Sequence, residues 1–145
     1  MAIGVCIPLP GNGQYQTQWD YLLSSFPPDV LYVIGDEADA PTTNVFSKLN
    51  ATYIETPADL PDEPAFVVLA QENGRWVQGE ESLLTFEHPD DVIYFFGHDT
   101  RWVSDEQIDG KTVDHFVFIP TATSDDLWSW TAGAMVFWDR MVKSG

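Results

Sequence analysis

Residues 91–143 hold a succession of features that restricts the fold more than any other part of the chain. Residues 92–96 and 115–119 are apolar runs rich in β-branched and aromatic side chains, which favour buried strands. The first run is followed by Gly97 and the second by Pro120, which cannot donate a backbone hydrogen bond to a sheet. The pattern therefore predicts two buried strands that each end in a loop.

A helix is expected after the second of these strands. Thr123 and Asp126 have the spacing of a capping box, which places the helix start between them. Apolar and small residues then recur at steps of three or four, which predicts a helix with one broad buried face. The members of this face are Leu127, Trp130, Thr131, Ala134, Phe137, Trp138 and Met141.

Apolar runs and helical patterns alternate in the first part of the chain. Strands are expected over residues 3–9, 30–34, 51–55 and 65–70. Trp19, Leu22 and Leu23 share one face of a helix, and Thr42 or Thr43 could cap a second helix. Such alternation is typical of a parallel sheet that is covered on both faces.

The segment before residue 91 is predicted to depart from this alternation. Asn73-Gly74 between two extended runs is typical of a hairpin, in which residues 67–71 would pair with residues 75–78. Residues 79–86 are then expected to form a short helix. The predicted sheet would thus contain one antiparallel pair.

The chain of 145 residues is expected to form one domain, residues 1–145, because an apolar content of 44% suffices for a single core. Its lone cysteine, Cys6, lies in an apolar run and is interpreted as a core residue. No apolar run approaches the roughly 18 residues of a membrane span, and the N-terminus lacks the basic region of a signal peptide. We therefore expect a soluble cytoplasmic protein without membrane contact.

The charge of the chain is unusual. Six Lys and Arg residues stand against 23 Asp and Glu residues, which gives a formal net charge of −17. Phosphate contacts supply most of the affinity of proteins that hold RNA, so this composition disfavours unaided RNA binding. Three interpretations stay open: partner chains or salt change the balance, the substrate is not RNA, or a halophilic source enriches surface acids.

Four short motifs follow one another in the last third of the chain. They are Gly97-His98-Asp99, Ile119-Pro120, Leu127-Trp128-Ser129 and Trp138-Asp139-Arg140. Their order resembles that of the SpoU or TrmH-like family of SPOUT RNA ribose methyltransferases, which has a glycine-rich loop, an Ile-Pro strand end, a Leu-Asn-Leu motif and a Tyr-Asp-Arg motif. No single motif is specific, so the inference rests on their order and spacing.

The resemblance implies a parallel-sheet α/β three-layer sandwich whose C-terminal part forms a deep trefoil knot. It implies a bent S-adenosyl-L-methionine, bound mostly by the backbone of three loops. It also implies a homodimer through the last helix, and the small residues 132–134 would let a second helix approach closely. The residues expected at the cofactor are Leu69, Ala70, Phe96, Gly97, His98, Ile119, Thr121, Asp126, Leu127 and Trp128.

The family's reaction needs an acceptor oxygen aligned with the methyl carbon and a group that removes its proton. Asn12 resembles the first motif of the family, Asp99 stands where the family has a glutamate, and Ser129 lies in the third motif. These are the predicted catalytic residues. The arginine that follows the first motif in the family is absent, because the first 47 residues contain no Arg or Lys.

The sequence leaves three hypotheses about function. The chain is a SpoU-like enzyme that methylates a ribose 2′-hydroxyl of tRNA or rRNA, or a catalytically degenerate knotted relative that acts through protein contacts or as an acidic mimic of nucleic acid, or a plain doubly wound nucleotide-binding domain. The order of the motifs favours the first. No metal site is expected, because His88, His98 and His115 lie in separate segments without metal-ligand spacing.

Overall fold

The computed structural model of the chain describes residues 2–39, 49–71, 75–98, 103–123 and 127–144. The strands are β1 (Ile3–Pro8), β2 (Val30–Ile34), β3 (Thr52–Ile54), β4 (Ala65–Ala70), β5 (Glu81–Ser82), β6 (Val92–Phe95) and β7 (His115–Phe118). The helices are α1 (Gly13–Ser25), α2 (Asp105–Ile108) and α3 (Ser129–Ser144), with 3₁₀ turns η1 (Glu37–Asp39) and η3 (Pro57–Asp59). The helix predicted after Thr42 or Thr43 lies outside the described residues. None of the described helices is long and apolar enough to cross a membrane.

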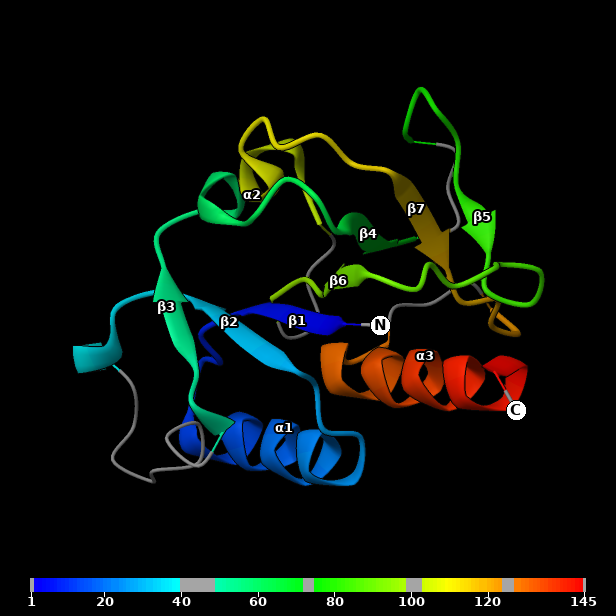
Figure 1. Cartoon of the computed structure of the whole chain (residues 1–145). Helices are drawn as coiled ribbons and strands as arrows, with labels where there is room; N and C mark the ends of the chain where they lie inside the picture. The colour runs from blue at the N-terminus through cyan, green and yellow to red at the C-terminus, as the bar shows by residue number, and fades with distance from the viewer. Residues whose placement is uncertain (1, 40–48, 72–74, 99–102, 124–126, 145) are drawn as a thin grey trace.

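The strands form one sheet in the order β3-β2-β1-β6-β4-β7-β5 (Figure 1). Every described pair of neighbours is parallel. The chain runs outward from β1 to β3 and then crosses to the other half of the sheet, so β1 lies beside β6. Open parallel sheets bind ligands at such a switch point, outside the carboxyl ends of the strands. The predicted parallel α/β architecture is confirmed.

Apolar side chains fill both faces of the sheet, as parallel strands with cover on each side require. One face packs against α1 and α3 around Trp19, Tyr94 and Phe96. The other face packs against α2 and the end of η3, and its core includes Cys6 and Phe95. Cys6 is fully buried, which confirms a core residue, and this burial raises the pKa of its thiol to about 12.

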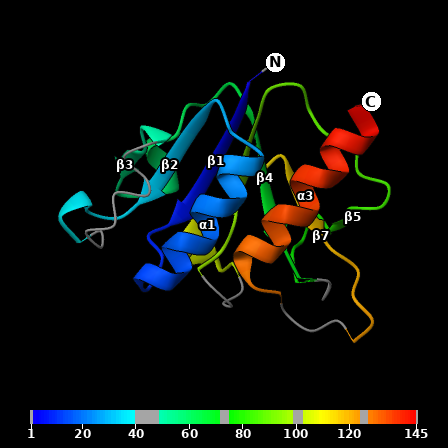
Figure 2. The same ribbon diagram turned by 90° about the horizontal axis from the view of Figure 1, so that it is seen from below.

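Helices α1 and α3 lie side by side on one face of the sheet (Figure 2). A Cβ atom at Gly133 of α3 would come within 2.8 Å of Leu22 Cδ2 and 3.3 Å of the Trp19 ring, both on α1. Gly133 is therefore required for the close approach of two helices within one chain. The expectation that residues 132–134 admit a helix of a second chain is wrong for this position.

The segment between β4 and β6 differs from the prediction. Both edges of β4 are occupied, by β6 on one side and β7 on the other, so the hairpin between residues 67–71 and 75–78 is wrong. The helix over residues 79–86 is also wrong. There β5 extends the sheet beside β7, and a turn that buries Leu83 and Phe86 follows.

The last helix starts later and faces another way than predicted. It begins at Ser129, and its inward side includes Arg140, which is only 6% exposed. Trp138 and Met141, predicted to be buried, are 57% and 50% exposed. The buried face of α3 is therefore rotated relative to the predicted one. Arg140 occupies an inward position because its donors form hydrogen bonds there.

Candidate functional site

Strands β1, β6, β4 and β7 are neighbours that run in the same direction, so their carboxyl ends share one edge of the sheet. Val68 of β4 pairs with Phe95 of β6, and Ala70 of β4 pairs with Phe118 of β7. The loops that follow β4, β6 and β7 therefore begin beside one another. We refer to this region as the strand edge.

Most residues predicted to bind the cofactor lie at the strand edge. Phe96 is buried, and Trp128 is 41% exposed. The half-buried members are Leu69, Ala70, Gly97, His98, Ile119, Thr121 and Leu127. Asp99 and Asp126 lie outside the described residues. Most of the described members are thus partly accessible at the carboxyl ends of neighbouring strands.

Two buried hydroxyl oxygens at the strand edge, Thr121 Oγ1 and Ser129 Oγ, have no hydrogen-bond partner among the described residues. Thr121 follows β7, and Ser129 is the first residue of α3 and only 6% exposed. Leaving a buried hydroxyl unpaired costs roughly 1–3 kcal/mol, and folded proteins pair most such groups. The described part of the chain therefore leaves these two hydroxyls unpaired.

Asn12 lies at the N-cap of α1, in the loop after β1. Its Oδ1 accepts a hydrogen bond from the Tyr15 backbone N–H at 2.9 Å, and its carbonyl oxygen accepts one from Gln16 N–H at 3.1 Å. Because β1 neighbours β6, this loop leaves the sheet on the same side as the loop after β6. Asn12 thus has a clear structural role in capping, and its catalytic role stays a prediction.

Three aromatic rings meet where α1 and α3 begin. The indoles of Trp128 and Trp130 stack with centroids 4.8 Å apart and an interplanar angle of 16°. The Tyr15 ring lies 5.3 Å from Trp128 and 5.0 Å from Trp130. We call these residues the aromatic cluster. Trp128 was predicted to lie at the cofactor, whereas Tyr15 was not singled out by the sequence.

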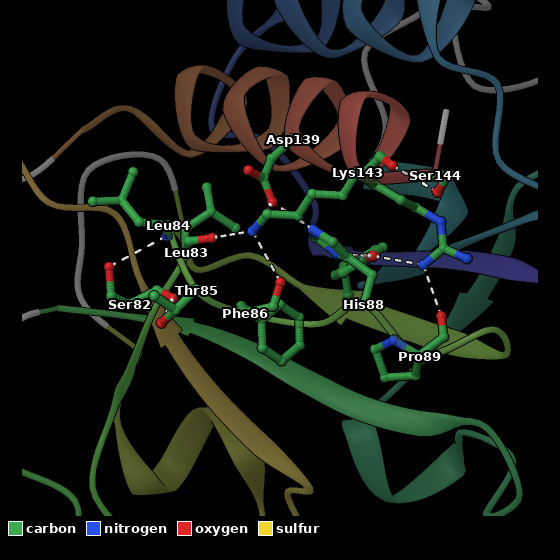
Figure 3. A network of polar contacts seen from close by, with 12 residues as sticks. Ser82, Leu83, Leu84, Thr85, Phe86, His88, Pro89, Asp139, Lys143 and Ser144 are labelled. Carbon is green, nitrogen blue, oxygen red and sulfur yellow. Dashed lines mark hydrogen bonds and ion pairs between the residues drawn. The ribbon is translucent and has the colours of Figure 1, made fainter.

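A second polar region lies near the C-terminal end of α3, where Figure 3 shows Asp139 and Lys143 of the helix together with His88. The Arg140 guanidinium donates to the carbonyl oxygens of Pro89 at 2.7 Å and Asp90 at 3.2 Å, and to the Tyr94 hydroxyl at 3.0 Å. Burying a guanidinium is tolerated here because three of its five N–H donors are paired by these bonds. These bonds hold the end of α3 to the segment that leads into β6.

His88 and Lys143 extend this region. His88 Nε2 lies 2.6 Å from Asp139 Oδ2, and His88 Nδ1 lies 2.7 Å from the Tyr94 hydroxyl. Lys143 Nζ lies 2.8 Å from the same carboxylate oxygen and donates to two carbonyl oxygens in the turn after β5. We call Arg140, Tyr94, His88, Asp139 and Lys143 the Arg140 network. Sequence patterns indicated no structural role for His88, and they placed Asp139 in a motif without indicating these contacts.

Burial lowers the pKa of His88 from its ordinary value of 6.5, against the opposing hydrogen bond to Asp139. The hydrogen bonds agree with a neutral ring. Arg140 donates a hydrogen bond to the Tyr94 oxygen, and the Tyr94 O–H donates one to His88 Nδ1. His88 Nε2–H then donates a hydrogen bond to Asp139. Burial also raises the pKa of the Tyr94 hydroxyl. The Arg140 network therefore has a structural role and lies away from the strand edge.

The described cations are all engaged in other parts of the molecule. They are Arg75, Lys111, Arg140 and Lys143. Lys111 Nζ donates to the Pro61 carbonyl oxygen at 3.3 Å, and Arg75 donates to the Val103 carbonyl oxygen at 3.2 Å. Arg140 and Lys143 belong to the Arg140 network. The other two of the six cations, Lys48 and Arg101, lie outside the described residues.

Two surface hollows lie apart from the predicted cofactor residues. One, of about 350 Å³, lies beside α2 and is lined by residues that include Trp76, Ile108 and Phe116. The other, of about 480 Å³, lies at the ends of β2 and β3 and is lined by Asp36, Glu37 and Glu55 among others. None of the residues predicted for the cofactor lines either hollow, so neither changes the assignment of the strand edge.

The sequence matches no protein-family model and no curated protein. Solved structures, in contrast, match nearly the whole chain. TrmJ from Z. mobilis ZM4 has a TM-score of 0.70 at 14% identity, covering 97% of this chain and 69% of TrmJ. The SpoU methyltransferase AviRb from Streptomyces viridochromogenes, in complex with the cofactor AdoMet, has a TM-score of 0.73 at 19% identity, covering 98% of this chain and 61% of AviRb.

A further match is a protein whose structure gives insights into the 2-OH methylation of C/U34 on tRNA. Its TM-score is 0.72 at 14% identity, and the match covers 99% of this chain and 91% of that chain. At these identities the likeness establishes the fold. The chain has the fold of SpoU methyltransferases.

Proposed function

We propose that this chain, built on the fold of SpoU methyltransferases, binds S-adenosyl-L-methionine and methylates a ribose 2′-hydroxyl of tRNA or rRNA. Two of the solved structures that share its fold support this: AviRb is in complex with AdoMet, and another concerns 2-OH methylation on tRNA. The observation in the chain itself that carries the proposal is the pair of buried hydroxyls of Thr121 and Ser129. They lie at the edge where a parallel sheet binds its ligand.

The residues of the strand edge fit such a cofactor. Leu69 and Ile119, which are half-buried, offer apolar surface for the adenine ring, and the hydroxyls of Thr121 and Ser129 offer hydrogen bonds to polar groups. When bound, S-adenosylmethionine would supply an electrophilic methyl carbon on a sulfonium. Residues of the chain would meet the other requirements of methyl transfer.

The chain must align the acceptor oxygen, exclude water and accept a proton. Asn12 is placed to orient the ribose, because it begins α1 in the loop after β1, beside the loop after β6. Ser129 lies at the start of α3 on the same side of the sheet. Asp99 is the proposed proton acceptor, on the strength of the family resemblance alone.

We also propose the trefoil knot and the homodimer that the family resemblance implies. The shared SpoU fold supports the knot. For the dimer, Met135, Trp138 and Val142 leave one stripe of α3 between 41% and 57% exposed. Apolar stripes of this kind mark interaction surfaces. In sedimentation, Trp138→Glu should give a monomer while Tyr21→Glu, on α1, leaves the dimer intact; a monomeric wild type would contradict the dimer.

A methyl-transfer assay tests the proposed function. The purified chain is incubated with radiolabelled S-adenosylmethionine and unmodified tRNA or rRNA, and the RNA is digested to nucleosides. We expect label in 2′-O-methylated nucleosides. Label in methylated bases would contradict the ribose acceptor, and no transfer to either RNA would contradict the function.

Asn12→Asp separates capping from catalysis in the same assay. Asp caps helices as well as Asn does, so the free energy of unfolding should stay the same. The amide donor is lost, and the transfer rate should fall at least about tenfold. An unchanged rate would limit Asn12 to its capping role.

A further inference from the structure

The aromatic cluster presents a preformed ring surface to solvent. Trp128 is 41% exposed, and its indole stacks on that of Trp130 with centroids 4.8 Å apart. Tyr15 supports both indoles from α1. Because each ring is held by the other two, little rotamer freedom is left to lose when a ligand binds. The half-buried Trp130 and Tyr15 close the seam between α1 and α3, whereas the exposed part of Trp128 contributes little to that packing.

The cluster adjoins the strand edge. Ser129, whose buried hydroxyl lacks a partner among the described residues, stands between the two tryptophans in sequence. Asn12 caps the turn that carries Tyr15. A ligand group that reaches Asn12 and Ser129 would therefore meet the exposed ring of Trp128.

The net charge of the chain restricts the chemical class of the ligand group that could bind at Trp128. The net charge is −17, and the described cations are engaged with carbonyl oxygens or carboxylates elsewhere. Tight attachment through many phosphates is therefore disfavoured. Stacking of a base on an aromatic ring needs no cation and contributes about 1–3 kcal/mol per base.

We propose that the aromatic cluster is a stacking platform for one unpaired nucleobase of the RNA substrate, which lies on the exposed face of Trp128. This rests on the proposed function and narrows its substrate class. A base inside a duplex has both faces covered, so the acceptor nucleotide belongs to a loop or an end. The affinity for RNA should then depend more on this stacking contact than on the salt concentration.

Fluorescence of 2-aminopurine tests the platform without relying on activity. The probe is a short single-stranded RNA that contains 2-aminopurine, and the same sequence in a duplex is its control. With wild-type protein we expect quenching and saturable binding for the single strand only. Trp128→Ala should lower the affinity about tenfold and abolish quenching, and Trp128→Phe should restore most of both. Tyr21→Ala, which removes an exposed aromatic ring from α1, should change neither.

Salt dependence gives a second measure. The slope of log affinity against log salt should be shallower than about −1.4, the value for two phosphate contacts of a single strand. A steeper slope, equal binding of the duplex, or full affinity of Trp128→Ala would overturn the platform. So would a Trp128→Ala variant that loses S-adenosylmethionine yet keeps RNA, because the ring would then cover the cofactor.

Titration of wild-type protein with S-adenosylmethionine separates this proposal from the proposed function. Cofactor binding without quenching of the single strand would overturn the platform alone. Quenching without cofactor binding would overturn the proposed methyltransferase and keep the platform as an RNA-binding feature.

Discussion

The two ends of α3 use their polar groups in opposite ways. At the C-terminal end, Arg140 donates to three oxygens, and Lys143 bonds to Asp139 and two carbonyl oxygens. At the N-terminal end, the buried hydroxyl of Ser129 has no partner among the described residues, and neither does that of Thr121 nearby in sequence. Arg140 and Ser129 are both buried, yet the polar groups of Arg140 are paired by the chain itself and the hydroxyl of Ser129 is not.

This difference separates stability from function along one helix. Paired buried groups hold the end of α3 to the sheet, and removing one leaves its partners unsatisfied. Unpaired buried groups cost stability, and they are retained where a ligand completes them. Substitutions at the C-terminal end should therefore lower the free energy of unfolding, whereas substitutions at the N-terminal end should lower affinity.

The largest effect on stability is expected at Arg140. Arg140→Met keeps much of the side-chain volume but leaves the buried Tyr94 hydroxyl and the carbonyl oxygens of Pro89 and Asp90 without their donor. The free energy of unfolding, measured in urea, should fall by about 3–5 kcal/mol, because each hydrogen bond from a charged donor contributes about 1.5–3 kcal/mol. Arg75→Met removes an exposed arginine, so it should cost less than about 1 kcal/mol. Equal losses for the two variants would contradict the contrast.

Gly133 should give the next largest effect. A side chain there would press on Leu22 and Trp19 of α1, so Gly133→Val should lower the free energy of unfolding by about 1–3 kcal/mol. Gly13→Val is the matched control, because a Cβ atom at Gly13 meets nothing within 4 Å. Similar urea midpoints for the two variants would show that α1 and α3 are not in close contact.

His88 predicts the direction of a pH effect. Its folded pKa is lowered from 6.5, so its contribution to stability is fully present above pH 6.5 and is lost as pH falls toward the folded pKa. The charged groups that face it are Asp139, Lys143 and Arg140. The wild type should lose stability relative to His88→Gln between pH 7 and pH 5. A constant difference between their urea midpoints over that range would mean that His88 does not titrate as described.

Thr121→Val should have the smallest effect on stability. The substitution keeps the shape of the side chain and removes only the unpaired hydroxyl, so the free energy of unfolding should stay the same or rise by up to about 1 kcal/mol. Affinity for S-adenosylmethionine should fall about tenfold in calorimetry, the worth of one hydrogen bond. Thr112→Val, at an exposed position away from the strand edge, should change neither. A clear loss of stability at Thr121 would show that the chain itself uses this hydroxyl.

The sequence was informative where structure is decided locally. The runs at residues 30–34 and 65–70 became β2 and β4 with the predicted bounds, because apolar β-formers bounded by turn residues leave few alternatives. Helix α2 was missed, although Ser104 and Gln107 form a capping box that was readable in the sequence. The hairpin failed for a different reason. The local Asn-Gly signal was overridden when distant strands occupied both edges of β4.

The candidate site was only partly predictable. Loops after parallel strands meet at one edge whatever their side chains, so the position of Phe96 and Ile119 followed from topology. The burial of Arg140 did not, because hydrophobic patterns place arginine outside, and only partners 46 to 51 residues away make burial favourable. The aromatic cluster was not predictable either, because it joins residues from opposite ends of the chain.

Calorimetric titration of the wild-type chain with S-adenosylmethionine, and separately with S-adenosylhomocysteine, tests the central claim most directly. The account predicts saturable heat with a stoichiometry of one ligand per chain for at least one of the two. Absence of heat at millimolar ligand would contradict it. The buried hydroxyls of Thr121 and Ser129 would then need another explanation, and the degenerate relative that acts through protein contacts would become the better hypothesis.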